Sequence, residues 1–193
     1  MKSLLVPSIK AQLLRAGAAL HCCPTKDLKA AVAIVIVERE ELSLLLIKKC
    51  EKEGYDWSGH MAFPGGRVDE TDPTLLDTAL RELFEEVGIA ESSVEQIASL
   101  GTFQTHIKNL SVEAFLFLWQ GRDEIKVHEA EVEWAIEVPL AQFLNHHLIN
   151  EYGRKNPDEL GLDLQYPVGE HIVWGLTARM LYSLLETLRS TLL

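Results

Sequence analysis

Three glutamates, Glu82, Glu85 and Glu86, lie close together in a segment that has the apolar pattern of a helix. At this spacing the three carboxylates share one face of the helix, opposite its apolar stripe. Like charges in this arrangement destabilise a helix by roughly a few tenths of a kcal/mol per pair. The cluster is therefore typical either of a solvated helix face or of a site that binds a cation. Carboxylate oxygens of this kind suit Mg²⁺ or Mn²⁺.

A glycine turn precedes the glutamate cluster, within the segment Phe-Pro-Gly-Gly-Arg at residues 63–67. Glycine allows the backbone to approach a ligand closely and to present a carbonyl oxygen. Arg81, next to Glu82, is suited to orient a carboxylate through a bidentate hydrogen bond. Divalent metals held by such groups bridge phosphate oxygens and lower the pKa of a bound water. The sequence therefore favours a metal site that acts on a phosphorylated small molecule.

The elements that must position these residues alternate between strands and helices. Asp72 is the expected N-cap of the glutamate helix, Pro73 its first residue, and Gly88 its left-handed C-cap. The apolar stripe of this helix contains Leu76, Leu80, Leu83 and Val87. Apolar runs predict strands at 29–37, 42–47, 60–63, 94–104, 111–119 and 131–138, and helices at about 1–20, 139–144 and 174–193, with a long loop over 145–165.

This order predicts an α/β (α+β) fold in which a mixed β-sheet is sandwiched between α-helices. A chain of 193 residues is expected to form a single domain, with residues 1–28 as an N-terminal helical extension and a core from about 29 to 193. The net charge of −11 excludes a nucleic-acid backbone as the main partner. Cys22, Cys23 and Cys50 suggest no disulfide framework, and no apolar run is long enough for a membrane span, so we expect a cytoplasmic protein.

The glutamate helix and its glycines together resemble the Nudix box, the signature of hydrolases that cleave nucleoside diphosphates linked to another moiety. Residues 81–89, Arg-Glu-Leu-Phe-Glu-Glu-Val-Gly-Ile, match that box at every fixed position. The upstream half differs, because Asp72 stands where the box has Glu and eight residues rather than seven separate it from Arg81. The resemblance implies a Nudix fold with Glu82 and Glu86 as the main metal ligands. It also implies Glu85 as a further ligand, Arg81 as an orienting catalytic residue, and the carbonyl of Gly65 or Gly66 as another metal contact.

The longer spacing resembles the coenzyme A diphosphatase branch of that family, which also has Phe-Pro-Gly-Gly and an acidic stretch like 69–72. Gly59, three residues before Phe63, and the run 174–179 match this branch as well. The front of its signature, Thr-x-Arg followed by Ser or Ala, is replaced here by Ile47-Lys48-Lys49-Cys50. The resemblance implies hydrolysis of coenzyme A or acyl-CoA to 3′,5′-ADP and a phosphopantetheine product. A homodimer is compatible with this reading.

Residues outside the box are expected to complete the site. A proton acceptor for the attacking water is needed, and Glu131 fits the family pattern better than Glu129 or Glu133. Lys49 and Arg67, with Lys48, are candidates for phosphate contacts, against a solvated surface role. Trp57 and Tyr55 are candidates for stacking on adenine, against ordinary loop packing. His60 and His106 are read as structural histidines or substrate contacts.

Two alternatives remain open at this point. The first is hydrolysis of ADP-ribose, a dinucleotide or a nucleoside triphosphate by the same site. The second is a Nudix-fold sensor that binds a nucleotide without cleaving it. The intact glutamates Glu82, Glu85 and Glu86 speak against the sensor, since such domains commonly lose the carboxylates of the box.

Overall fold

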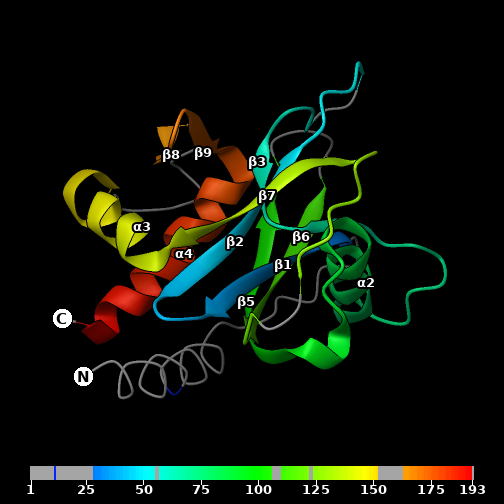
Figure 1. Ribbon diagram of the computed structural model, residues 1–193, viewed down its shortest axis with the longest axis horizontal. Coiled ribbons are helices and arrows are strands. Elements are labelled where there is room, and N and C mark those ends of the chain that lie inside the picture. The colour runs from blue at the N-terminus through cyan, green and yellow to red at the C-terminus, as the bar shows by residue number, and fades with distance from the viewer. Residues whose placement is uncertain are drawn as a thin grey trace.

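A computed structural model of the chain describes residue 11 and residues 28–54, 57–105, 110–121, 124–151 and 163–192 (Figure 1). Its strands are β1 (Leu28–Glu38), β2 (Leu42–Lys49), β3 (Met61–Ala62), β4 (Gly65–Arg67), β5 (Val94–Gln104), β6 (Ser111–Trp119), β7 (Val132–Pro139), β8 (Gln165–Val168) and β9 (His171–Trp174). Its α-helices are α2 (Leu75–Val87), α3 (Leu140–His146) and α4 (Gly175–Leu192), and shorter helical turns are η1 (Glu91–Ser93) and the π-helical η2 (His147–Glu151).

Seven of the described strands form one mixed sheet with the order β3-β2-β1-β6-β5. The long apolar strands β1 and β2 make the expected hairpin, and β1 runs parallel to β6. The first half of β1 pairs with β4, while the end of β2 pairs with β3 on one side and with β7 on the other. The short strands β3 and β4 therefore lie where β1 and β2 diverge.

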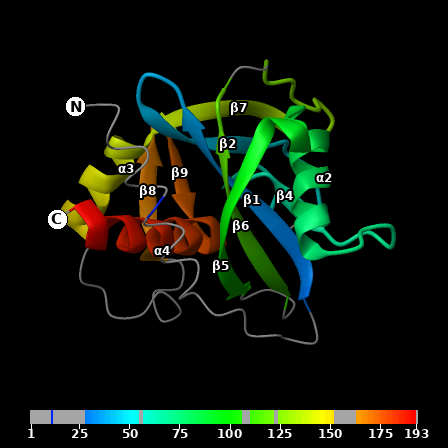
Figure 2. The ribbon, with the colours of Figure 1, turned by 90° about the horizontal axis from the view of Figure 1, so that it is seen from below.

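The sheet is covered on both faces, as Figure 2 shows with α2 on one side and α3, α4 and the β8–β9 hairpin on the other. Alternate residues of the central strands contribute to two separate hydrophobic cores, since successive side chains of a strand point to opposite faces. Leu45 and Ile47 of β2 join the core under α2, whereas Leu44 and Leu46 join the core under α3 and α4. The predicted mixed sheet between helices is confirmed.

Helix α2 begins later than the sequence suggested. Its N-cap is Thr74, whose hydroxyl accepts a hydrogen bond from the backbone N–H of Asp77, so the prediction of Asp72 as N-cap is wrong. The carboxylate of Asp72 is bound instead by side chains further along the helix, described below. The C-terminal prediction is confirmed, because Gly88 has a φ of 74° and its N–H donates to the carbonyl of Phe84.

The predicted loop over 145–165 is wrong at its start, because α3 continues to His146 and η2 follows it. The β8–β9 hairpin, which begins where the predicted loop ends, is absent from the sequence prediction. Tyr166 and Val173, which pair across it, are fully buried and anchor it on α3 and α4. The Pro64-Gly65-Gly66 segment is also more regular than a turn, because Gly65–Arg67 is strand β4. The expected N-terminal helix lies almost entirely outside the described residues, as do Cys22 and Cys23. Among the described helices, none has the length and apolar content needed to cross a membrane.

Candidate active site

The carboxylate of Glu86 is buried beneath strand β4. Glu86 is 1% exposed, and its Oε2 accepts a hydrogen bond of 2.8 Å from the backbone N–H of Gly65. Gly65 is required there, since a Cβ would lie 2.5 Å from the carbonyl oxygen of Ala31 on the paired strand. Burial raises the pKa of Glu86, and the nearby charges of Lys49 and Glu131 act in opposite directions on it. Of the two interpretations that the sequence left open for this helix face, a solvated surface or a cation site, the burial of Glu86 argues against the solvated surface at this position.

Glu82, one turn earlier, rests directly on Gly66. A Cβ at Gly66 would lie 2.5 Å from the carboxyl carbon Cδ of Glu82, so the absence of a side chain at Gly66 makes the room for this carboxylate. The Glu82 side chain is 13% exposed, and burial raises its pKa. The glycine pair therefore lets two poorly solvated carboxylates of α2 lie against β4.

Arg81 holds the carboxylates of the helix and of the preceding loop together. Its Nε and Nη2 donate to the two oxygens of Asp72 at 2.9 and 3.0 Å, and Nη1 donates to Glu82 at 2.9 Å and to Glu85 at 2.8 Å. Nη2 also donates to the carbonyl of Arg67. The hydrogen bonds from Arg81 hold the pKa of Asp72 well below its usual range. Asp72, which stands where the box has Glu, is thus the anchor of Arg81.

Glu85 differs from the other two glutamates because it faces solvent. Its side chain is 51% exposed, and its contact with Arg81 is an i, i+4 pair on the helix surface. A second ligand role at this position stays a prediction. Both interpretations of the sequence, a solvated helix face and a metal ligand, are compatible with the position of this side chain.

The segment before β7 brings Glu131 to the end of α2. The N–H of Lys126 donates to the carbonyl of Val87, and the N–H of His128 donates to that of Glu86. Glu131 follows in a turn closed by its N–H on the carbonyl of His128, and its charge is close enough to Glu86 to raise the pKa of that residue. The exposed carboxylate of Glu131 thus lies on the solvent side of the buried pair.

The ammonium group of Lys49 places a positive charge at the buried carboxylates. Its Nζ lies 2.7 Å from Glu86 Oε1 and 3.3 Å from the carbonyl oxygen of Gly65. A carboxylate and a backbone carbonyl are the hard oxygen donors that Mg²⁺ and Mn²⁺ prefer. The residues therefore fit a divalent cation. Among the described residues, however, no three His, Cys, Asp or Glu side chains stand grouped as metal ligands, and Arg81 and Lys49 contact the glutamates instead.

The remaining candidates are spread over both faces of the sheet. Arg67 is exposed beside the site. Trp57 packs against the core on the α3 and α4 side, which is not the core beneath α2. Lys48 points to that same far side and pairs with Glu133 at 3.2 Å. Tyr55 and His106 lie outside the described residues.

Two features of this site escaped the sequence reading. The first is the Gly65 N–H as a hydrogen-bond donor to Glu86, and the second is Asp72 as the partner of Arg81. The signal for the second was present, since an aspartate just before the helix and an arginine within it form a natural bidentate pair. The first has no local signal, because it depends on strand β4 pairing with β1.

Comparison with known proteins agrees with this geometry. A model of the NUDIX domain matches residues 27–157. An uncharacterized Nudix hydrolase, NudL, from Salmonella paratyphi B is 35% identical over 160 residues, which cover 81% of this chain and 80% of that protein. The chain therefore belongs to the Nudix family. It is an enzyme of the hydrolase class that acts on acid anhydrides of phosphorus, and enzymes of this family generally use divalent metal ions.

Solved structures confirm the fold at lower identity. The Nudix hydrolase RenU of M. smegmatis superposes with a TM-score of 0.53 at 10% identity, covering 86% of this chain and 88% of that one. An Ap4A hydrolase of C. elegans superposes with a TM-score of 0.50 at 20% identity, covering 64% of this chain and 87% of that one. These similarities show a common fold and carry no information on substrate.

Proposed function

We propose that this enzyme hydrolyses the diphosphate of coenzyme A or acyl-CoA, giving 3′,5′-ADP and (acyl-)phosphopantetheine. The observation that carries the proposal is the longer spacing of its box. Asp72, shifted by the extra residue, receives two hydrogen bonds from Arg81 at 2.9 and 3.0 Å. The long spacing that resembles the coenzyme A branch is thus accommodated with the arginine anchored, and is not a defect of the motif.

Glu82 and Glu86, with the carbonyl of Gly66, are the proposed holders of Mg²⁺ or Mn²⁺, and Glu85 is a proposed further ligand. When bound, such ions neutralise the charge of the diphosphate and lower the pKa of a bound water. Arg81 keeps Glu82 in place through the bond at 2.9 Å. Most of the rate acceleration then comes from positioning and charge neutralisation, as is general for phosphoryl transfer.

Glu131 is the proposed proton acceptor. The oxygen of the attacking water forms a bond to one phosphorus, the bridging P–O bond of the diphosphate breaks, and the proton of the water passes to the Glu131 carboxylate. An exposed carboxylate close to the buried pair suits this role, because it is open to solvent and to the attacking water.

One observation favours the second candidate, a different nucleoside diphosphate derivative such as ADP-ribose or a dinucleotide. The coenzyme A branch has arginine at the position of Lys49, which would grip a phosphate in two places. Here the Lys49 ammonium is bound to Glu86 at 2.7 Å. Part of the phosphate recognition of that branch is therefore replaced in this chain.

A substrate panel separates the two candidates. The purified protein is incubated with Mg²⁺ or Mn²⁺ and coenzyme A, acyl-CoA, ADP-ribose, a dinucleotide or a nucleoside triphosphate, and products are identified by mass. Glu86→Gln, prepared in parallel, controls for contaminating hydrolases. We expect 3′,5′-ADP from coenzyme A. Intact coenzyme A beside cleaved ADP-ribose would reject the first candidate.

A further inference from the structure

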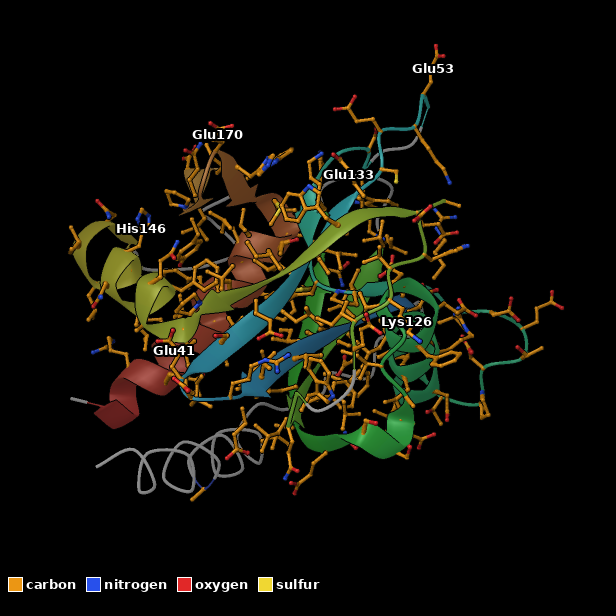
Figure 3. The ribbon with its side chains drawn as sticks, viewed as in Figure 1. Glu41, Glu53, Lys126, Glu133, His146 and Glu170 are labelled. Carbon is orange, nitrogen blue, oxygen red and sulfur yellow. The ribbon has the colours of Figure 1, made fainter. Side chains whose placement is uncertain are left out.

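A hollow of about 470 Å³ lies between strand β3 and the β8–β9 hairpin. This volume is within the range of roughly 300 to 1,000 Å³ that is typical of small-molecule sites. Its lining comes from Gly59, Met61, Gln165, Glu170, His171, Ile172 and Trp174. Figure 3 labels Glu170 on the hairpin and Glu133 near the start of β7.

Met61, which lines the hollow, belongs to a row of side chains across three strands. Lys48 of β2 pairs with Met61 of β3 on one side and with Trp134 of β7 on the other. Directly paired residues point to the same face of a sheet, so Lys48 lies on the face covered by the hairpin. Its Nζ is 3.5 Å from the place that a Cβ of Gly59 would take, which puts a positive charge beneath the β3 wall.

Aromatic rings connect the hairpin to this row. The Trp174 ring lies 4.5 Å from the His60 ring, and the His171 ring lies 5.1 Å from the Trp134 ring, both measured between centroids. Trp174 remains 37% exposed, so part of its surface is open to a ligand. Burial and the charge of Lys48 lower the pKa of His60, which keeps this ring neutral near pH 7.

The rim adds the hydrogen-bonding groups that a purine requires. The carboxylate of Glu170 accepts hydrogen bonds, and the amide of Gln165 both donates and accepts them. A planar ring system with an exocyclic amine therefore matches an open tryptophan together with an acceptor at the rim. Base stacking on an aromatic side chain is a common mode of nucleotide binding.

This hollow is built mostly by residues outside the family match. The NUDIX domain model covers residues 27–157, whereas the hairpin wall is formed by residues 165–174. Lys48 and Lys49 are consecutive on β2 and point to opposite faces, toward the hollow and toward Glu86. The hollow therefore lies on the opposite face of β2 from the candidate metal site, and most of its lining residues lie beyond the part of the chain that the family model matches.

We propose that the hollow binds the adenine base of the substrate, stacked on Trp174, with its exocyclic amine donating to Glu170. This inference rests on the proposed function for the identity of the nucleotide. The hollow would then recognise the nucleoside half of the substrate, while the box glutamates act on its diphosphate.

Direct binding gives the first test. The full chain is titrated with 3′,5′-ADP, without divalent metal, by calorimetry, with inorganic phosphate as the ligand control. We expect Trp174→Ala to weaken binding of 3′,5′-ADP about 5- to 100-fold, and Trp174→Phe to retain most of it. Ile149→Ala removes a side chain that is 80% exposed elsewhere and is expected to change nothing. Equal affinities for the wild type and Trp174→Ala, with unchanged thermal stability, would overturn the proposal.

The exocyclic amine gives a sharper test. The wild type is expected to prefer an adenine nucleotide over the matching hypoxanthine nucleotide, since a carboxylate repels the hypoxanthine carbonyl. Glu170→Gln replaces the carboxylate with an amide that also donates, so the preference should fall about tenfold. A preference that survives in Glu170→Gln would contradict the assigned orientation of the base.

Kinetics then separate this inference from the proposed function. If coenzyme A is the substrate, Trp174→Ala should raise its KM by a factor similar to the loss of binding, with kcat little changed. Cleavage of coenzyme A with an unchanged KM would overturn the base site and leave the proposed function standing. Cleavage of only another adenine nucleotide, with its KM raised in Trp174→Ala, would overturn the coenzyme A assignment and support the base site.

Discussion

Lys49 Nζ lies 2.7 Å from Glu86 Oε1, although the two residues are 37 positions apart in the chain. The side chains are 12% and 1% exposed. A carboxylate this poorly solvated is costly unless a cation balances it. Lys49 is therefore a cation supplied by the protein at the proposed metal site, and its charge offsets the cost of burying the Glu86 carboxylate when no metal is bound.

Lys49→Met should destabilise the metal-free protein by about 2 to 4 kcal/mol, because breaking a buried ion pair leaves the other charge uncompensated. Urea unfolding at neutral pH measures this loss. Saturating Mg²⁺ or Mn²⁺ should restore part of it, since a ligand of the folded state stabilises that state. If metal raises the unfolding free energy of Lys49→Met by no more than that of the wild type, the lysine and the metal do not balance the same carboxylate.

The neighbouring lysine provides a matched control for this variant. Lys48 pairs with Glu133, whose side chain is 52% exposed, so Lys48→Met leaves no buried charge behind. We expect a smaller loss than for Lys49→Met and no rescue by metal. Equal losses in the two variants would mean that aliphatic packing, not charge, accounts for the effect.

The two glutamates at the end of α2 should differ in their effect on turnover. Glu86→Gln removes a buried charged ligand and is expected to lower kcat at least about 10²-fold. Glu85 is half exposed, so Glu85→Gln should cost less if its role is that of a further ligand. Steady-state kinetics on the substrate identified by the panel measure both. Near-normal turnover of Glu86→Gln would reject the metal assignment.

Gly66→Ala should be destabilising because of Glu82 and not because of the backbone. The new Cβ would lie 2.5 Å from Glu82 Cδ, and overpacking of this kind typically costs about 1 to 3 kcal/mol. In a Glu82→Ala background the clash disappears, so the same substitution should be nearly neutral. A double-mutant cycle by urea unfolding measures this coupling, and additive effects of the two substitutions would refute it.

Much of the fold followed from local patterns in the sequence. The apolar runs located β1, β2, β5, β6 and β7 to within a few residues, and the three- and four-residue apolar spacing located α2 and α4. The hairpin β8–β9 was missed because each of its strands has only four residues. Strands this short leave little alternation to detect, and this pair is stabilised by packing on α3 and α4.

In the candidate site, too, the features set by local spacing could be predicted from the sequence, whereas the contacts between distant segments could not. The order and spacing of Glu82, Glu85 and Glu86 were readable because a helix converts spacing into a shared face. The burial of Glu82 and Glu86 could not be predicted from the sequence, since it depends on strand β4, which contacts the helix and pairs with the distant strand β1. The contact of Lys49 with Glu86 joins two elements that are far apart in the chain. The sequence therefore suggested a phosphate contact or a solvated surface role for Lys49, and not this ion pair.

Asp72 should contribute to stability in a pH-dependent way. Its side chain is 4% exposed, and Arg81 holds its pKa well below the usual range. A carboxyl with a depressed pKa stabilises the fold fully above its unfolded pKa, about 4, and loses that contribution as the pH falls through its folded pKa. Asp72→Asn should therefore cost about 1 to 2 kcal/mol near pH 7, and the difference from wild type should shrink below about pH 4.

Unfolding curves collected between pH 7 and pH 3 test this expectation. Glu70→Gln, at an exposed position in the same loop, removes a charge without a contact to Arg81 and should leave the wild-type pH dependence intact. A difference between Asp72→Asn and wild type that stays constant with pH would show that the carboxylate charge is not what holds Arg81.

Glu131 should be distinguishable from its two acidic neighbours by the pH dependence of the rate. If its carboxylate accepts the proton of the attacking water, Glu131→Gln should lower kcat by about 10²- to 10⁴-fold, with KM little changed, and should remove the acidic limb of the pH–rate profile. Glu129→Gln and Glu133→Gln are the controls, because both remove a charge from the same segment. A comparable loss in Glu129→Gln or Glu133→Gln would move the base to that residue. A loss shared by all three would indicate a general effect of negative charge beside Glu86, whose pKa already responds to Glu131.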